Sequence, residues 1–459
     1  MTSLSGKEKQ AGSNEVKIKY QEEPPAGRLK LFDLYTIALG GVVGAGVVSL
    51  TGAALGMTGI TMWFAYILAI FLGAITNIPY FFVSSTLRLG GGEYSTIGAL
   101  LNEKVAGLYV LVRLLYPIWF GTYAISFASY MFSIFPGLNV KLVGLIFIAV
   151  LFIINSFGIS ASSKAQNIMF ILLIVGLGSF IIAGIPKITN PVFNFSAPEH
   201  FTGGAKGFID AIVTLAVSCQ AYNMVTQYGR DANNAKRDIP KSMLLILPTL
   251  IVLYGGCALV ASGILPLSEI ANQPLTYTAQ AIMPDWLFII FIIGVIMAIA
   301  TTINGTMVGS MNIISQSVDN GWLPGIINKK NKHGVPVAIL AYECICACIP
   351  VITGLNIGSL AQYHNLIMPS LSILFTIAVL QLPKKYPNSW NKSMFNMPNS
   401  LFKIVMVISL IAQASMLSNS LINLDKIVIL SAIVLFILIM IYVNYKSKKQ
   451  IKIEISAWE

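Results

Sequence analysis

The chain has 459 residues, of which 56% are apolar and 10% are charged, and its formal net charge is +11. A soluble domain carries about 25% charged residues, so this composition excludes an ordinary soluble protein and indicates a membrane protein. The basic surplus alone is compatible with nucleic-acid binding, but its distribution along the chain assigns it to membrane topology instead.

The predicted elements are membrane-spanning helices between two polar tails. Residues 1–30 lack an apolar h-region, so they are expected to form a tail and not a cleaved signal peptide. A spanning helix needs about 20 apolar residues. By this measure the sequence predicts twelve spans, at 32–53, 59–85, 105–131, 139–156, 165–185, 206–228, 242–266, 284–315, 335–353, 360–382, 400–422 and 425–446. Residues 447–459 are expected to form the second tail.

The distribution of lysine and arginine predicts the orientation of these spans. With twelve spans, both termini lie on one side, where 24 of the basic residues fall; 4 fall on the other side, and Arg113 lies inside a span. The positive-inside rule therefore predicts a multi-pass cell-membrane protein with both termini in the cytoplasm. The lipid bilayer is an expected partner, nucleic acid is not, and the oligomeric state is left open.

The first span is unusually rich in glycine: residues 38–56 read "ALGGVVGAGVVSLTGAALG". One interpretation is close helix packing, because Gly40/Gly44 and Gly52/Gly56 form two GxxxG pairs. The other is an unwound segment at Gly44-Ala45-Gly46, whose free backbone N–H and C=O groups would bind the two charges of a zwitterion. A matching interruption in the sixth span favours the unwound segment.

Two sets of five spans predict an internal repeat. Spans 1–5 (domain 31–200) and spans 6–10 (domain 201–383) can be superimposed, leaving spans 11 and 12 in residues 384–446. An odd number of helices per repeat inverts the second copy, and inverted-repeat transporters bind substrate between discontinuous helices. The sequence therefore predicts an all-α integral membrane protein with a five-plus-five inverted repeat, in which helices 1 and 6 are broken and two further helices follow.

Four motifs resemble the amino acid–polyamine–organocation (APC) superfamily of transporters. "LFDLYTIALGGVVGAGVVSLTG" is similar to the family's first helix, and "GGGEY" at 90–94 to its signature after the second. "NNAKRDIPKS" at 233–242 resembles the family's NPxRDIPxA motif, and "SVDNGWLPGIINKKNKHGVPV" resembles its segment between helices 8 and 9. The resemblance implies the same twelve-helix inverted repeat and the transport of an amino acid or amine.

The resemblance also implies substrate-binding residues. The backbone at the break of helix 1 would hold the substrate carboxylate, and carbonyl groups before that break and in helix 6 would hold its amino group. The corresponding residues here are Val43, Gly44, Ala45, Gly46, Val47, Val217, Ser218, Cys219 and Gln220. Val217 and Cys219 stand where many members have an aromatic cover, so either the site is roomier or Tyr222 or Tyr116 closes it.

The coupling site departs most from the family. Many members carry a coupling lysine in helix 5 at the position of Leu173. Arg113, a cation deep in the third span, is a candidate replacement for this lysine. Its alternative roles are to bind an acidic group of the substrate or to pair with Glu343. Asn304 is a substrate-binding candidate, and Ser310 a candidate for the ion-like pocket. Glu93 in the "GGGEY" loop is expected to be solvated.

The leading functional hypothesis is a secondary transporter of an amino acid or related amine that works by alternating access. The alternatives are an obligate exchanger of such compounds and, from another class, a transporter-like amino acid receptor. No HExxH, GxSxG or phosphate-loop motif is present in the sequence, so an enzyme is not expected. We also expect neither a cofactor nor a metal site.

Overall fold

The computed structural model describes residues 28–135, 137–355, 357–422, 424–448 and 451. The predicted tails therefore lie almost entirely outside the described residues. Within the described ranges the secondary structure is helical, with three isolated β-bridges and no strand. One of these bridges joins Leu29 to Ala232 and attaches the segment around residue 29 to the loop after the sixth predicted span.

The helices of the first five predicted spans begin at Leu31. They are α1 (Leu31–Val42), α2 (Ala45–Thr58), α3 (Met62–Thr86), α4 (Gly92–Leu100), α5 (Glu103–Arg113), α6 (Pro117–Ile134), α7 (Val140–Ser156), α8 (Ile159–Gly184) and the 3-10 turn η1 (Ile185–Lys187). The third predicted span is divided between α5 and α6, because Pro117 lacks the backbone N–H that a continuous helix would need there and is the first residue of α6.

The next five predicted spans contain more irregular helix. They comprise α9 (Gly204–Ala216), η2 (Val217–Cys219), η3 (Ala221–Tyr228), α10 (Ala235–Leu250), η4 (Ile251–Gly255), α11 (Gly256–Gly263), α12 (Leu267–Ile270), α13 (Leu275–Ile282), α14 (Asp285–Asp319), η5 (Gly325–Asn328), α15 (Val337–Thr353) and α16 (Ile357–Val379). The η4 segment is a π-helical turn that begins three residues after Pro248, which lacks the N–H that a regular helix needs.

The last part of the chain contains α17 (Leu382–Lys385), α18 (Pro387–Asn391), α19 (Asn399–Ile422) and α20 (Lys426–Ser447). Nine helical segments among the described residues are long and apolar enough to cross a membrane, and the bent pair of α1 and α2 is a tenth candidate. Two shorter apolar helices, α7 and α15, coincide with the predicted fourth and ninth spans. The protein is therefore a multi-pass helical membrane protein.

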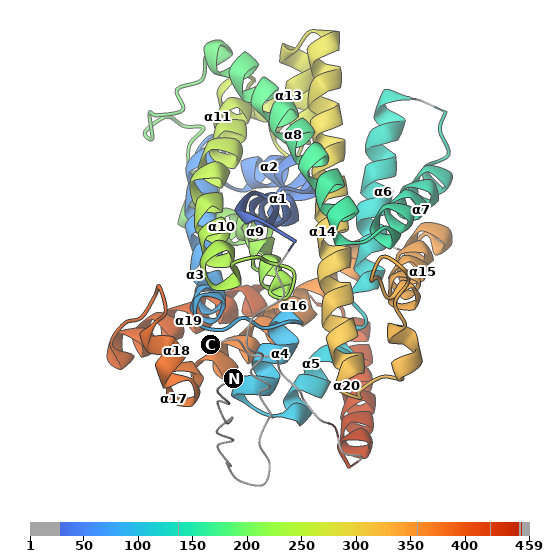
Figure 1. The fold of residues 1–459 in the computed structure, drawn as a ribbon. Coiled ribbons are helices and arrows are strands. Elements are labelled where there is room, and N and C mark those ends of the chain that lie inside the picture. The colour runs from blue at the N-terminus through green and yellow to red at the C-terminus, as the bar shows by residue number, and fades with distance from the viewer. Residues whose placement is uncertain (1–27, 136, 356, 423, 449–450, 452–459) are drawn as a thin grey trace, which may run out of the picture.

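The interior of the molecule is formed by the two broken spans. In Figure 1, α1, α2 and α9 lie in the middle, with α3, α10 and α11 on one side and α8 and α14 on the other. The same arrangement appears in the contacts, because α1 packs against α8, α10, α14 and η3, and α2 packs against α9. The helices α6, α7 and α15 pack together on one flank. Both breaks thus lie at the centre of the fold.

Candidate functional site

The interruption of the first span lies between α1 and α2, whose axes are bent by 41°. Val43 and Gly44 are the non-helical residues, and Gly44 has an extended backbone with φ −126° and ψ −151°. The sequence placed the unwound segment at 44–46, and this placement is wrong by about one residue, because Ala45 and Gly46 already belong to α2. The helix resumes at Ala45 because α2 contains no proline and because Gly46 fits closely against Ser218.

The freed carbonyl groups at the end of α1 accept hydrogen bonds from the protein itself. The hydroxyl of Tyr254 donates to the carbonyl oxygen of Val42 at 2.9 Å, and the hydroxyl of Thr302 donates to that of Gly40 at 2.7 Å. A Cβ atom on Gly44 would lie 2.8 Å from the Thr302 hydroxyl, and one on Gly46 would lie 2.6 Å from the Cβ of Ser218. These glycines therefore allow α14 and η2 to approach closely, as the packing interpretation expects.

The interruption of the sixth span lies at the predicted residues. The α9 helix ends at Ala216, and Val217–Cys219 form a 3-10 turn before the non-helical Gln220. The Asn77 amide on α3 donates to the backbone oxygen of Gln220 at 2.9 Å. The 3-10 turn leaves backbone carbonyl groups without the N–H donors of a regular helix, and the Asn77 amide replaces one of these missing donors.

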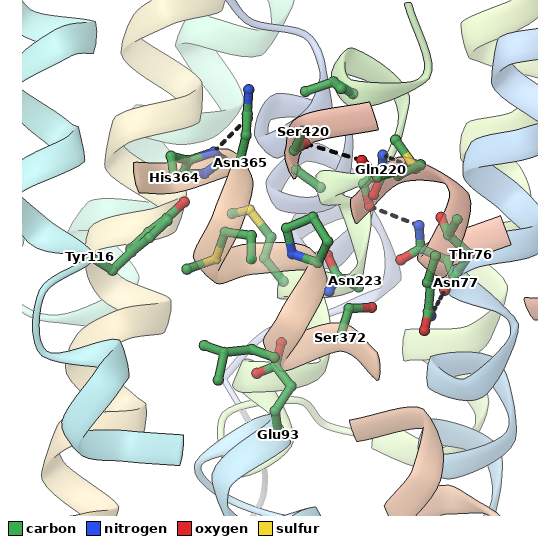
Figure 2. A pocket seen from close by; sticks show the side chains of 18 of the residues that line it. Thr76, Asn77, Glu93, Tyr116, Gln220, Asn223, His364, Asn365, Ser372 and Ser420 are labelled. Carbon is green, nitrogen blue, oxygen red and sulfur yellow. Dashed lines mark hydrogen bonds between the residues drawn. The ribbon is translucent and has the colours of Figure 1, made fainter. Parts of the chain in front are cut away.

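A cavity of about 390 Å³ lies beside the sixth-span break. Its described lining comes from α2, α3, α4, α5, α9, η2, η3, α14, α16 and α19 and from Tyr116 and Gln220 between helices. It contains thirteen uncharged polar side chains besides its charged and aromatic groups. In Figure 2, Glu93 points into this cavity from α4, with Tyr116, His364 and Asn365 on one side and Thr76, Asn77 and Gln220 on the other.

Four of the predicted site residues line this cavity, namely Arg113, Tyr116, Val217 and Gln220. The other candidates that the structure describes do not line the cavity. They are Val43, Gly44, Gly46, Val47, Ser218, Cys219, Asn304, Ser310 and Leu173. The side chain of Ala45 lies outside the described part of the structure. The cavity is therefore adjacent to the break of span 6 and separated from the break of span 1.

The span 8 candidates lie in the helix packing instead. The Asn304 amide donates to Gln166 Oε1 at 2.9 Å and to Ser162 Oγ at 3.3 Å, so it joins α14 to α8. Leu173 on α8 is fully buried in the apolar core. Ser310 is also buried, and its hydroxyl has no hydrogen-bond partner among the described residues. Sequence alone did not separate these packing positions from cavity positions on the same helices.

Arg113 is the last residue of α5 and is 6% exposed. Its guanidinium carbon lies 3.9 Å from the centre of the Tyr116 ring, and Nη1 contacts the Met368 sulfur at 3.0 Å. Among the described residues, no carboxylate oxygen lies within ion-pairing distance of this guanidinium, and Nε has no hydrogen-bond partner. The pairing with Glu343 that the sequence suggested is absent there; the buried Glu343 carboxylate has no hydrogen-bond partner in the described structure.

Glu93 is the functional candidate that sequence reasoning missed. It was expected to be solvated, and this expectation is wrong, because Glu93 is only 4% exposed. Gly91 and Gly92 precede it with φ of +81° and +53°, conformations that side chains disfavour, and a Cβ atom on Gly92 would lie 2.9 Å from Gln227 Cγ. The glycine turn thus starts α4 against η3 and buries its first acidic residue.

The Glu93 carboxylate accepts a hydrogen bond from Gln227 Nε2 at 3.3 Å. Burial raises the pKa of this carboxyl above its ordinary value, and the positive charge of Arg113 acts in the opposite direction. Glu93, Arg113 and Tyr109 thus lie close enough to interact electrostatically, and we call this region the charged end of the cavity. The acid of "GGGEY" was visible in the sequence, but its burial depends on η3, which lies 134 residues further along the chain.

A second cavity, of about 380 Å³, lies at the N-terminal end of α8 and the C-terminal end of α14. Its lining includes the basic residues Arg28, Arg230 and Lys330 and the acidic Asp231. Burial raises the pKa of the Asp231 carboxyl, which accepts a hydrogen bond from Asn312 at 3.2 Å. Gln227 on η3 lines both cavities, so the two cavities lie next to each other at this residue.

A multi-pass helical protein with broken central helices and two cavities that share a lining residue has the architecture of a membrane transporter. The comparison with known proteins agrees with this class. Residues 29–455 match the amino acid permease family, and the chain belongs to that family.

Several relatives have similar sequences. The methylthioribose transporter of Bacillus subtilis (strain 168) is 25% identical over 395 residues, which cover 81% of this chain and 84% of the relative. The branched-chain amino acid permease BcaP of the same organism is 23% identical over 385 residues, covering 78% and 82%. Its amino-acid permease RocE is 22% identical over 362 residues, covering 75% and 76%. Each of these relatives is named as a transporter or a permease, and the substrates given in the three names differ.

Proposed function

We propose that this protein is a secondary transporter of an amino acid or a closely related amine and that it works by alternating access. The observation that carries the proposal is the pair of neighbouring cavities that are both lined by Gln227. In an alternating-access transporter the substrate site connects in turn to each side of the membrane, and a thin partition between two cavities is what such a site requires. The names of the relatives, several of which are amino acid permeases, support the same substrate class.

The finer architecture is part of the same proposal. The nine long candidates, the bent pair and the two shorter apolar helices coincide one by one with the twelve predicted spans, which supports the five-plus-five inverted repeat with helices 11 and 12 added. We place the protein in the cell membrane with both termini in the cytoplasm, because the basic residues concentrate on that side. The domain boundaries predicted from the sequence belong to this proposal as well.

We further propose that transport is exchange or facilitated transport. Leu173 occupies the position of the family's coupling lysine and cannot carry a charge, and its side chain is completely enclosed in the core. The hydroxyl of the buried Ser310 is the kind of oxygen ligand that a small cation prefers, but the aliphatic neighbours on α8 supply no further oxygen donor. Arg113 is the alternative, proton-linked candidate.

The test is transport by the purified protein in proteoliposomes. Vesicles loaded with unlabelled leucine should accumulate labelled leucine without any ion gradient. Accumulation in empty vesicles, driven by an imposed proton or sodium gradient alone, would contradict the exchange mechanism. If none of the twenty standard amino acids and no polyamine competes for uptake or is itself transported, the proposed substrate class is wrong.

A further inference from the structure

The second cavity, at the N-terminal end of α8, carries an excess of positive charge. Among its described lining residues, the cations Arg28, Arg230 and Lys330 face a single carboxylate, that of Asp231. No ion pair that the structure describes includes any of these three cations. Their charges nevertheless act on Asp231, because each of them lowers the pKa of its carboxyl against the effect of burial. The charge of this lining therefore favours an anionic ligand.

A buried amide in the same cavity lacks hydrogen-bond partners. Asn155 lies in the last turn of α7, is 1% exposed and belongs to the lining. Neither its Nδ2 nor its Oδ1 has a hydrogen-bond partner in the described structure. Buried polar groups are costly when they are left unpaired. A ligand that accepts a hydrogen bond from Nδ2 and donates one to Oδ1 would satisfy this side chain.

The backbone at the start of α8 supplies further donors. Gly158 and Ile159 line the cavity, and no side chain caps this end of the helix. Gly158 has φ of +92°, and a Cβ atom there would lie 3.0 Å from the carbonyl oxygen of His333, so glycine allows the loop before α15 to approach the start of α8. The first N–H groups of a helix have no partner within it, and together with the helix dipole they attract anions.

We propose that the second cavity binds a phosphate group in its monoprotonated, dianionic form. Its oxygens accept hydrogen bonds from Asn155 Nδ2 and the start of α8, its hydroxyl donates to Asn155 Oδ1, and the positive charges of Arg28, Arg230 and Lys330 neutralise it. A soluble phosphate compound and a phosphomonoester lipid headgroup share this chemistry. The inference goes beyond the proposed transport function and does not depend on it.

The experiment is isothermal titration calorimetry with purified full-length protein in neutral detergent, at mildly alkaline pH and without phosphate buffer. Inorganic phosphate probes the soluble source, and phosphatidic acid in the same micelles probes the lipid source. Sulfate and phosphatidylcholine are the matched comparisons, because sulfate has no proton to donate and phosphatidylcholine has no dianionic headgroup. One phosphate probe or both should bind, about tenfold or more tighter than the matched comparison, since a lost hydrogen bond to an anion costs about this much.

Asn155→Leu separates a ligand-binding role from a structural one. It should weaken binding of the phosphate probe about tenfold or more, because the anion loses its amide partner. The melting temperature of the ligand-free variant should equal or exceed that of the wild-type protein, since leucine removes two buried polar atoms that have no described partner. Replacing an asparagine with a merely structural role would instead lower the melting temperature.

Two charge variants should shift the affinity in opposite directions. Lys330→Gln should weaken phosphate binding severalfold, and Asp231→Asn should strengthen it, because the first removes a cation and the second removes a carboxylate that repels the anion. Lys332→Gln is the matched control, since Lys332 is exposed, lies two residues from Lys330 and is outside the described lining. It should leave the affinity unchanged. These variants test the proposal even if Asn155→Leu does not fold.

The inference is overturned if neither phosphate probe binds the wild-type protein, or if sulfate binds as tightly as inorganic phosphate. It is also overturned if the folded lining variants keep the wild-type affinity, or if Lys332→Gln weakens binding as much as Lys330→Gln does, because the attraction would then belong to the basic surface in general. Failure of the leucine transport assay would contradict the proposed function and leave this binding result standing.

Discussion

The two helix breaks at the centre of the molecule differ in what surrounds them. At the break of span 1, carbonyl oxygens of α1 accept hydrogen bonds from Thr302 and Tyr254, and Gly46 packs against Ser218. At the break of span 6, Val217 is 44% exposed and lines the cavity together with Gln220. At the first break two carbonyl groups already have protein hydrogen-bond partners, whereas the second break borders a cavity that a ligand can enter.

This difference shows that an interrupted helix is not by itself a binding site. Breaking a helix frees backbone donors and acceptors, and tertiary packing then decides whether protein side chains or a ligand will satisfy them. In this protein, hydroxyl groups from η4 and α14 satisfy acceptors at the first break. The following predictions test the contrast, from the largest expected effect to the smallest.

Gly46→Leu should abolish leucine binding while the protein remains inserted in the membrane. A side chain at this position would collide with Ser218, since even a Cβ atom would lie 2.6 Å from the Ser218 Cβ, and the clash would displace the neighbouring break of span 6. Binding is measured by calorimetry and insertion by expression and gel filtration. Gly178→Leu is the control, because a Cβ atom there meets nothing within 4 Å. Normal binding by Gly46→Leu would mean that the two breaks are not coupled.

Thr302→Val should lower the free energy of unfolding by about 1–3 kcal/mol, because it removes the hydroxyl that donates to the Gly40 carbonyl and leaves that buried acceptor poorly satisfied. Thermal denaturation in detergent measures the effect. Thr306→Val on the same helix is the matched control, since the Thr306 hydroxyl bonds to its own helix at the Thr302 carbonyl. Equal stability of the two variants would show that the hydrogen bond from Thr302 to Gly40 does not contribute to the free energy of unfolding.

Val217→Phe should reduce leucine affinity about tenfold while leaving alanine affinity unchanged, because the larger ring fills cavity space beside the open break. Competition for labelled substrate in proteoliposomes measures the change. Val252→Phe is the control, since Val252 is 66% exposed and lies outside the described lining of the cavity. Unchanged selectivity would place the substrate side chain away from the sixth-span break.

Leucine affinity should fall severalfold as the pH is lowered, and the fall should begin at a higher pH than an ordinary glutamate produces. Burial raises the pKa of Glu93, which lines the cavity, so its carboxylate loses its negative charge earlier on acidification and attracts a cationic group in the cavity less strongly. The charged and titratable groups that face it are Arg113 and Tyr109; Tyr80 and Tyr116 are also influenced by its charge. Calorimetry from pH 5 to 8 measures the profile, and Glu93→Gln should flatten it. An identical profile in that variant would assign the titration to another group.

Much of the helical framework was predictable because the bilayer imposes a simple pattern. Apolar runs of spanning length occur where the long helices lie, and the polar run at 218–220 indicated the break of span 6. The break of span 1 was predicted to within about one residue, since clustered glycines weaken a helix without specifying the residue at which it ends. The family was likewise recognisable, because its motifs are local.

The sequence by itself therefore determined the class of protein, the approximate positions of the membrane helices and the two places where a central helix is broken, because these depend on composition and local backbone preference. Only the tertiary structure decided which polar groups face a cavity. Asn304 points into a hydrogen-bond network with α8, whereas Glu93, expected in a solvated loop, is enclosed by η3 beside Arg113. The burial and hydrogen bonding of these two side chains depend on residues more than a hundred positions away, and one sequence carries no local signal for such contacts.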